Sequence, residues 1–306
     1  MDYAISVHDL TKVFGSFTAV DRLSLNIKPG EICGFLGPNG AGKTTAIRML
    51  CGILTPTSGF GQILGYDLIK ESEKIKPHIG YMSQKFSLYD DLTVEENLSF
   101  YAGLYSLPNS ERKNRIKEMI TMAQLTSRED EVVANLSGGW KQRLALGCAI
   151  IGRPSIVFLD EPTSGVSPTS RRDFFTIIQK LANQGTTVIV TTHFMDEAER
   201  CNRIAFISAG QLLAMDTPDN LKQSAVEGFM VELDLPQAID QIDRIEQQLY
   251  VRECSLHGPL LHVLLDNESN VKELEELVGK SARPITPTLE DVFIALAKKK
   301  RKQVVR

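Results

Sequence analysis

The sequence lacks both the paired cysteines of metal cages and redox motifs and the long apolar runs of membrane proteins. Its five cysteines are scattered and form no CxxC pair, so neither a cysteine metal cage nor a redox motif is expected. An odd, unclustered set fits a reducing compartment, and we expect each thiol to behave as a small buried apolar side chain. No apolar run approaches the ~20 residues that a helix needs to span a bilayer.

The amino terminus and the charge balance exclude two further classes. The first ten residues, MDYAISVHDL, contain no basic region followed by an apolar stretch, so no signal peptide is expected and we place the protein in the cytosol. A net charge of -4 offers no strongly basic surface for a phosphate backbone, so we expect no nucleic-acid partner. Any work at a membrane would then need a partner that spans it.

Short apolar runs alternate with amphipathic helical patterns through the first two thirds of the 306 residues. Runs that are apolar throughout indicate parallel strands that are buried on both faces. They occupy residues 32–36, 155–159, 187–191 and 203–207, and an amphipathic helix is expected at 170–184. The pattern predicts an α/β fold with a parallel sheet covered on both faces.

Two regions depart from this alternation. A polar helical pattern at 109–124 predicts a helical subdomain at about 86–150, inside a first domain that covers residues 1–220. From residue 221 to 306 strand and helix patterns indicate a small α+β domain, with helices expected at 238–249, 271–278 and 289–297. Its basic end, 298–302, has two interpretations: contact with anionic lipid headgroups, or a solvated tail.

A glycine-rich segment follows the first buried strand and precedes a helix. It fits the phosphate-binding pattern G-x-x-x-x-G-K-[ST]. Backbone N–H groups of such a loop surround phosphate oxygens, and the next helix points its positive end at the same anion. We expect the Lys43 ammonium to reach the β- and γ-phosphates and the Thr44 hydroxyl to bind Mg²⁺. The loop consists of Gly37, Pro38, Asn39, Gly40, Ala41, Gly42, Lys43 and Thr44.

Two consecutive carboxylates follow the second buried strand. Asp160 is placed where it can hold Mg²⁺, and Glu161 where it can orient and polarise an attacking water. A phosphate-binding loop alone does not distinguish kinases, GTPases and ATPases, and the N-K-x-D pattern of a GTPase is absent. The residues between the loop and these carboxylates make the distinction.

Residues 136–140, Leu-Ser-Gly-Gly-Trp, resemble the LSGGQ signature of ATP-binding cassette (ABC) ATPases, and the resemblance covers about residues 3–220. It implies a P-loop NTPase core that binds ATP and Mg²⁺ and dimerises, so that the signature of one subunit faces the P-loop of the other. Ser137, Gly138 and Gly139 would then donate hydrogen bonds to the γ-phosphate, and Thr45 would join the nucleotide-binding loop.

Other positions of the resemblance carry over residue by residue. Gln84 is similar to the glutamine that senses Mg²⁺ and water and couples to the membrane domain. His193 resembles the switch histidine, which contacts the γ-phosphate and holds Glu161. Phe14 resembles the aromatic residue that stacks on adenine; Phe17 is the alternative, and core packing is a second reading for either.

Two positions depart from the family pattern. Trp140 stands where the signature has Gln, and its indole has two open interpretations: contact with nucleotide or partner, or packing against the helical region. Ser167 stands where the family usually has an Asp before Pro168. Serine carries no charge at this dimer contact, so weaker coupling or slower hydrolysis is expected.

The segments 192–199 and 287–293 resemble the ATPase subunits of multidrug and daunorubicin-type exporters, including the YbhF type. This implies a separate membrane permease, a second ATPase subunit in a homodimer, and a peripheral position at the cytoplasmic face of the membrane. Export of a drug-like or hydrophobic compound follows by analogy only, because the permease reads the substrate.

Other kinds of ABC protein remain to be weighed. Translation-factor types carry two cassettes in one chain, and DNA-repair types insert long coiled coils, whereas this sequence has one P-loop and no sustained heptads. A soluble or regulatory ABC ATPase with weak hydrolysis is the remaining alternative, because Trp140 and Ser167 depart from the pattern.

Overall fold

The computed structural model describes residues 2–85 and 87–304. Phe86, within the expected helical subdomain, and residues 305–306, at the end of the expected carboxy-terminal domain, lie outside the described residues. The chain forms two compact units, Met1–Met215 and Asp216–Arg306, and each is described by itself.

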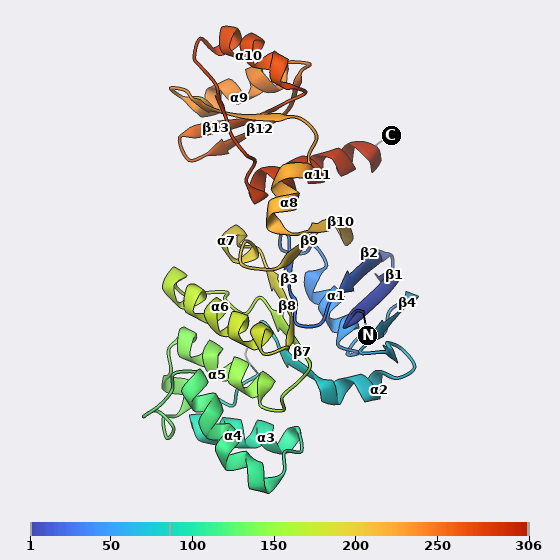
Figure 1. Ribbon diagram of the computed structural model, residues 1–306, viewed down its shortest axis with the longest axis vertical. Coiled ribbons are helices and arrows are strands. Elements are labelled where there is room, and N and C mark those ends of the chain that lie inside the picture. The colour runs from blue at the N-terminus through green and yellow to red at the C-terminus, as the bar shows by residue number, and fades with distance from the viewer. Residues whose placement is uncertain (1, 86, 305–306) are drawn as a thin grey trace. The chain divides into compact units, whose positions relative to one another are not determined.

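A six-stranded sheet forms the centre of the first unit, in the order β10-β9-β3-β8-β7-β6 (Figure 1). Neighbours from β9 to β6 pair in parallel. The prediction of an α/β fold with a parallel sheet is therefore confirmed. The strands are β3 (Ile32–Leu36), β6 (Ile79–Met82), β7 (Ile156–Asp160), β8 (Thr187–Thr192), β9 (Arg203–Ser208) and β10 (Gln211–Asp216).

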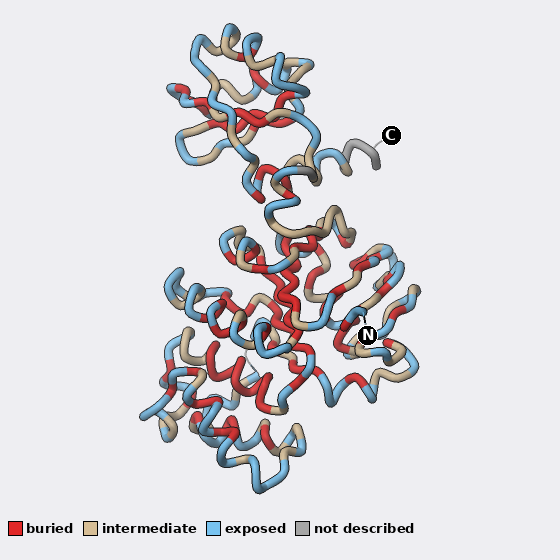
Figure 2. The backbone as a smooth tube through the Cα atoms, viewed as in Figure 1, coloured by how far each residue is buried: buried red, intermediate tan, exposed pale blue. Residues whose placement is uncertain are grey.

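Side chains of the central strands alternate between two hydrophobic cores, because successive residues of a strand point to opposite faces. On β7, Val157 and Leu159 enter one core, while Ile156 and Phe158 enter the other. The strands are buried along their length, as the continuous red stretches of Figure 2 show. Burial on both faces explains why these strands read as unbroken apolar runs in the sequence.

Helices cover one face of this sheet. Residues of α3, α4, α5 and α6 share the first core, and α3 begins with a capping box in which the Thr93 and Glu96 side chains bond each other's backbone N–H groups. Their bounds are α3 (Val94–Leu104), α4 (Asn109–Met122), α5 (Gly138–Ile150) and α6 (Pro168–Asn183).

The other face carries α1 (Lys43–Leu50) and an antiparallel sheet of order β2-β1-β4-β5. Residues of α1, β1, β2 and β4 pack with residues of the central strands in the second core. The remaining bounds are β1 (Ile5–Phe14), β2 (Phe17–Ile27), β4 (Ser58–Ile63), β5 (Tyr66–Asp67), α2 (Ser72–Ile75) and α7 (Met195–Ala198).

The second unit has an antiparallel sheet of order β12-β13-β11-β14 with its own core. Its strands are β11 (Phe229–Asp234), β12 (Val251–His257), β13 (Leu260–Leu265) and β14 (Arg283–Pro284), and its helices are α8 (Pro218–Ser224), α9 (Ala238–Glu246), α10 (Val271–Val278) and α11 (Leu289–Val304).

Two helices of this unit differ from expectation. α9 ends at Glu246 rather than 249, where the chain turns into β12. α11 continues through the expected basic tail, because Lys and Arg are good helix formers. Lys298 is paired with Glu246 at 3.1 Å and Glu253 at 2.6 Å, so the first residue of the tail is held within this unit.

Two simpler expectations concern cysteines and membrane spans. All five cysteines are free and buried, as predicted. Among the residues that the structure describes, no helix is both long and apolar enough to cross a membrane.

Candidate functional site

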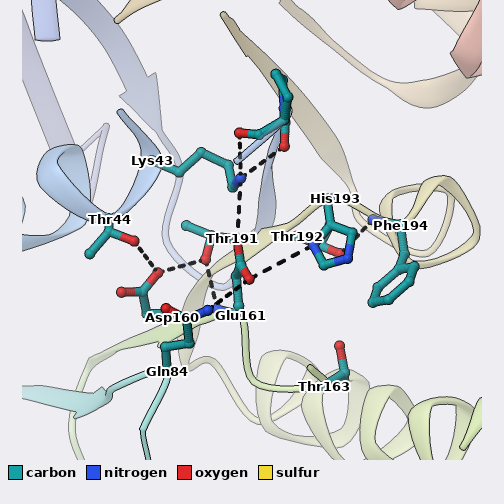
Figure 3. A network of polar contacts seen from close by, with 12 residues as sticks. Lys43, Thr44, Gln84, Asp160, Glu161, Thr163, Thr191, Thr192, His193 and Phe194 are labelled. Atoms are coloured by element: carbon teal, nitrogen blue, oxygen red, sulfur yellow. Dashed lines mark hydrogen bonds and ion pairs between the residues drawn. The ribbon is translucent and has the colours of Figure 1, made fainter. Parts of the chain in front are cut away.

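The residues expected to carry chemistry follow four neighbouring strands of the parallel sheet. The order β3-β8-β7-β6 brings the loop after β3 beside His193 after β8, Glu161 after β7, and Gln84 two residues after β6. Because parallel strands point the same way, all four ends meet at one edge of the sheet. Figure 3 shows these side chains converging on Glu161.

The phosphate-binding loop is closely packed against its surroundings. A Cβ atom at Gly37 would lie 2.0 Å from the backbone oxygen of Ile207, and one at Gly42, where φ is +99°, would lie 2.4 Å from that of Ala19. Only glycine fits both positions. The Lys43 ammonium is 4% exposed and donates to the backbone oxygens of Gly37 at 2.8 Å and Pro38 at 3.1 Å.

One carboxylate oxygen of Asp160 joins two strands and the helix after the loop. Its Oδ1 accepts hydrogen bonds from the Thr44 hydroxyl at 2.9 Å and from the Thr191 hydroxyl at 2.9 Å. The same Thr191 oxygen accepts from the backbone N–H of Glu161 at 2.7 Å. These bonds fix the start of α1 and the ends of β7 and β8 against one another.

Glu161 lies at the centre of the group. Its Oε1 is 3.4 Å from the Lys43 Nζ, and its Oε2 accepts from the Gln84 Nε2 at 3.2 Å. His193 Nδ1 is 3.8 Å from Oε2 and has no hydrogen-bond partner among the described residues, although it is buried. The Glu161 backbone has φ +47°, a left-handed conformation that costs a non-glycine residue about 1–3 kcal/mol and is typical of active sites.

The group is chemically suited to a magnesium nucleotide. A buried ammonium stands at the start of α1, whose first turn contains no acidic residue, so the helix end favours a phosphate. The Thr44 hydroxyl, the Asp160 carboxylate and the Gln84 amide are hard oxygen donors, which Mg²⁺ prefers. The residues therefore fit both the nucleotide and the ion.

A buried carboxylate that sequence reasoning missed lies behind this group. Glu197 is 1% exposed; its Oε1 accepts from the Thr163 hydroxyl at 2.5 Å and its Oε2 from the Thr192 hydroxyl at 2.6 Å. Burial raises the pKa of Glu197, and the two hydroxyl bonds oppose that rise. Thr163 follows Glu161 by two residues and Thr192 precedes His193, so Glu197 connects the segments that carry these two candidate residues.

The residues of the expected signature lie at the start of α5. Ser137 is exposed and its side chain makes no capping hydrogen bond to the helix. Cβ atoms built on Gly138 and Gly139 would approach Val166 and Ser170. Among the described contacts, none joins these three residues to Lys43 or Glu161 of the same chain.

The burial of three aromatic side chains shows which of them pack inside the protein, a question that the sequence left open. Phe14 and Phe17 are 49% and 63% exposed, so neither packs in the core, and both remain available for stacking. Trp140 is partly buried against the first core, and the centroid of its ring lies 5.3 Å from the guanidinium group of Arg128 and 5.1 Å from that of Arg143. Packing within the helical region therefore accounts for the tryptophan.

Ser167 has a structural role that was not expected from the sequence. It is the N-cap of α6, and its hydroxyl oxygen accepts from the Ser170 N–H at 3.2 Å, with Pro168 in the first turn. Serine and aspartate are equally good at such a position. Either residue can cap this helix. Serine in place of the usual aspartate therefore removes a negative charge but keeps the N-cap hydrogen bond.

Comparison with known proteins shows which proteins the chain resembles. A family model described as ABC transporter matches residues 20–164. The multidrug ABC transporter ATP-binding protein YbhF of Escherichia coli (strain K12), described as probable, is 48% identical over 238 residues, which are 78% of this chain. The match covers only 41% of YbhF.

Other relatives match over nearly their full length. The linearmycin resistance ATP-binding protein LnrL of Bacillus subtilis (strain 168) is 38% identical, with 95% of this chain and 97% of LnrL covered. A solved structure, the ATP-binding cassette MJ0796 as a post-hydrolysis dimer with ADP and Pi, is 28% identical with a TM-score of 0.64, and covers 70% of this chain and 98% of its own.

The capping role of Ser167 gives a prediction for stability. Ser167→Ala should lower the free energy of unfolding by about 1 kcal/mol, whereas Ser167→Asp should change it by less than about 0.5 kcal/mol, because aspartate also caps. Urea unfolding followed by circular dichroism measures both. Ser110→Ala, at an exposed helical position, is the control; equal losses for alanine and aspartate would contradict the assignment.

Proposed function

Because this chain belongs to the ATP-binding proteins of ABC transporters, we propose that it hydrolyses Mg-ATP to power export through a separate membrane permease. The observation that carries the proposal is the convergence of Lys43, Glu161 and His193 at neighbouring strand ends. The core of an ABC ATPase supplies the fold, and these side chains supply the chemistry.

Lys43 and the loop around it bind the phosphates. The ammonium is held by two backbone oxygens at the mouth of α1, where it meets the β- and γ-phosphates together with the N–H groups of the loop. Thr44, Asp160 and Gln84 would hold Mg²⁺, which when bound supplies a Lewis acid that neutralises charge on the phosphate oxygens.

Glu161 acts on the attacking water. As a carboxylate it accepts a hydrogen bond from that water and takes up its proton as the oxygen attacks the γ-phosphorus in line. The bond between the γ-phosphorus and the bridging oxygen of the β-phosphate breaks, so that ADP and phosphate are the products. Gln84 and His193, on its other oxygen, keep the carboxylate in position and place donors beside the γ-phosphate. Lys43 stabilises the charge that develops there.

A second copy of this chain completes the site. Ser137, Gly138 and Gly139 are free to face the nucleotide of a partner, since the Ser137 hydroxyl makes no cap of its own. The amino end of α5 would then point at the partner's γ-phosphate. ATP thus favours the closed dimer, and product release favours the open one.

The membrane partner is a permease on whose cytoplasmic face the dimer sits. The region around Gln84 to Tyr89, which comes after β6 in the sequence, would carry the nucleotide-dependent movement to a permease helix. Relatives named for multidrug transport and linearmycin resistance support export of a drug-like or hydrophobic compound, which the permease selects.

Glu161→Gln tests hydrolysis directly. The amide cannot take up the water's proton, so the steady-state ATPase rate should fall by about 10²–10⁴-fold while ATP binding persists. Phosphate release and nucleotide binding are measured on both proteins, with the exposed Glu199→Gln as control. Equal rates for Glu161→Gln and the parent would instead favour a regulator that does not hydrolyse ATP.

Glu197 is proposed as a positioning residue for the same reaction. It never reaches the nucleotide, but its two hydroxyl bonds hold the loops of Glu161 and His193 at a fixed separation. A small misplacement of catalytic groups lowers turnover without weakening substrate binding.

Glu197→Gln should therefore lower kcat about tenfold or more and leave the KM for ATP nearly unchanged, since no phosphate contact is lost. The rates are normalised to folded protein from thermal melting, and Glu199→Gln serves as the matched control. A variant that lost stability but kept the parent kcat would show that the carboxylate only supports the fold.

The missing charge at Ser167 gives a further expectation. Ser167→Asp restores the carboxylate at the dimer contact while keeping the α6 cap, so the ATPase rate at saturating ATP should rise above that of the parent. Ser167→Asn, which caps α6 without a charge, is the control. An unchanged ATPase rate for Ser167→Asp would contradict the proposal that the missing charge at this position slows hydrolysis.

A further inference from the structure

Two histidines of the second unit stack on one face of the β12–β13 hairpin. His262 pairs with Ser255 across the hairpin, and His257 follows Ser255 by two residues, so both imidazoles lie on the same face. Their rings are 3.9 Å apart and nearly parallel, at 11°. The His257 and His262 side chains are 18% and 8% exposed.

The buried carboxylate of Asp291, at the start of α11, meets both rings. Its Oδ1 lies 2.9 Å from His257 Nε2 and 3.1 Å from His262 Nδ1. The other oxygen, Oδ2, accepts from the N–H of Thr288 at 2.8 Å and from its hydroxyl at 2.7 Å. Oδ2 also lies 2.9 Å from His262 Nδ1, so His262 faces both carboxylate oxygens while His257 faces Oδ1.

We propose that His257, His262 and Asp291 form a binding site for a divalent transition-metal ion, with Zn²⁺ as its representative. One potential ligand atom from each residue lies within 4.8 Å of the others. Two imidazole nitrogens and one carboxylate oxygen suit Zn²⁺ and its neighbours, whereas Mg²⁺ and Ca²⁺ prefer oxygen donors. Three protein ligands leave a fourth position for water, on the partly exposed side of His257.

One of the two histidines has a carboxylate near its second ring nitrogen. A metal-bound imidazole usually directs its second N–H towards a carboxylate, which orients the ring. The Glu232 Oε2 lies 3.7 Å from His262 Nε2, on the side of the ring away from Asp291. Burial acts to raise the pKa of Asp291, but hydrogen bonds from Thr288 and His262 outweigh it and hold that pKa below its ordinary value.

The site would give the second unit a cross-link of its own. It joins the β12–β13 hairpin to the beginning of α11, where Asp291 already contacts the Ser255 and His262 side chains. Every ligand belongs to the second unit, so metal binding is independent of the proposed ATPase reaction and is measured without nucleotide.

Isothermal titration of the full chain with ZnCl₂ tests the proposal. The protein is freed of purification tags and chelator-treated beforehand, and nucleotide is omitted. One Zn²⁺ per chain is expected; His257→Gln and His262→Gln should each weaken binding more than about tenfold, and Glu232→Gln about tenfold. The exposed His78→Gln is the matched control and should bind like the parent. MgCl₂ and CaCl₂ should give no saturable binding at these residues.

Two outcomes would overturn the site. One is the absence of saturable Zn²⁺ binding by the parent, in which case the cluster is a hydrogen-bonded network only. The other is unchanged affinity in His257→Gln, which retains the fold because its side chain is the most exposed of the three. Visible absorption of bound Co²⁺ gives an independent readout: its spectrum should be lost in the His257→Gln variant and kept in His78→Gln.

Discussion

The buried carboxylate of Asp160 sets the geometry on which the ATPase site depends. One of its oxygens binds hydroxyl groups from α1 and β8, and the Thr191 hydroxyl in turn holds the backbone of Glu161. Asp160 is 1% exposed, so these bonds form where water does not compete. The start of α1, the Glu161 backbone and the end of β8 are therefore fixed relative to one another before any nucleotide arrives.

Charged side chains and a strained backbone lie next to Asp160. Glu161 has a left-handed backbone and faces the Lys43 ammonium across 3.4 Å. Such strain persists only where the surroundings hold it, and it is typical of residues that act in catalysis. The neighbouring Glu197 binds Thr163 and Thr192 on the segments around Glu161 and His193, so the candidate site is one connected network of polar contacts.

Much of this arrangement could be predicted because the phosphate loop, Glu161 and His193 each come at the end of an apolar run. Parallel pairing brings strand ends together without further information, so the residues after β3, β7 and β8 are expected at one edge. Gln84 is expected from the family resemblance alone, because the apolar runs in the sequence predict no strand before it. Glu197 could not be found this way, since its partners Thr163 and Thr192 are ordinary residues whose meeting depends on loop geometry. The contact of Asp291 with the two hairpin histidines could not be predicted either, because it also depends on tertiary structure. The environment of Trp140 could not be predicted without the positions of Arg128 and Arg143.

The central proposal is that a dimer of this chain contains two hydrolytic sites and that each site takes Lys43 from one copy and Ser137 from the other. It is tested most directly by mixing Lys43→Ala chains with Ser137→Arg chains and measuring ATP hydrolysis. Each variant alone should be inactive, while the mixture should recover about a quarter of the parent rate, because half of the dimers contain one intact composite site of two. A mixture as inactive as its components would contradict the shared site.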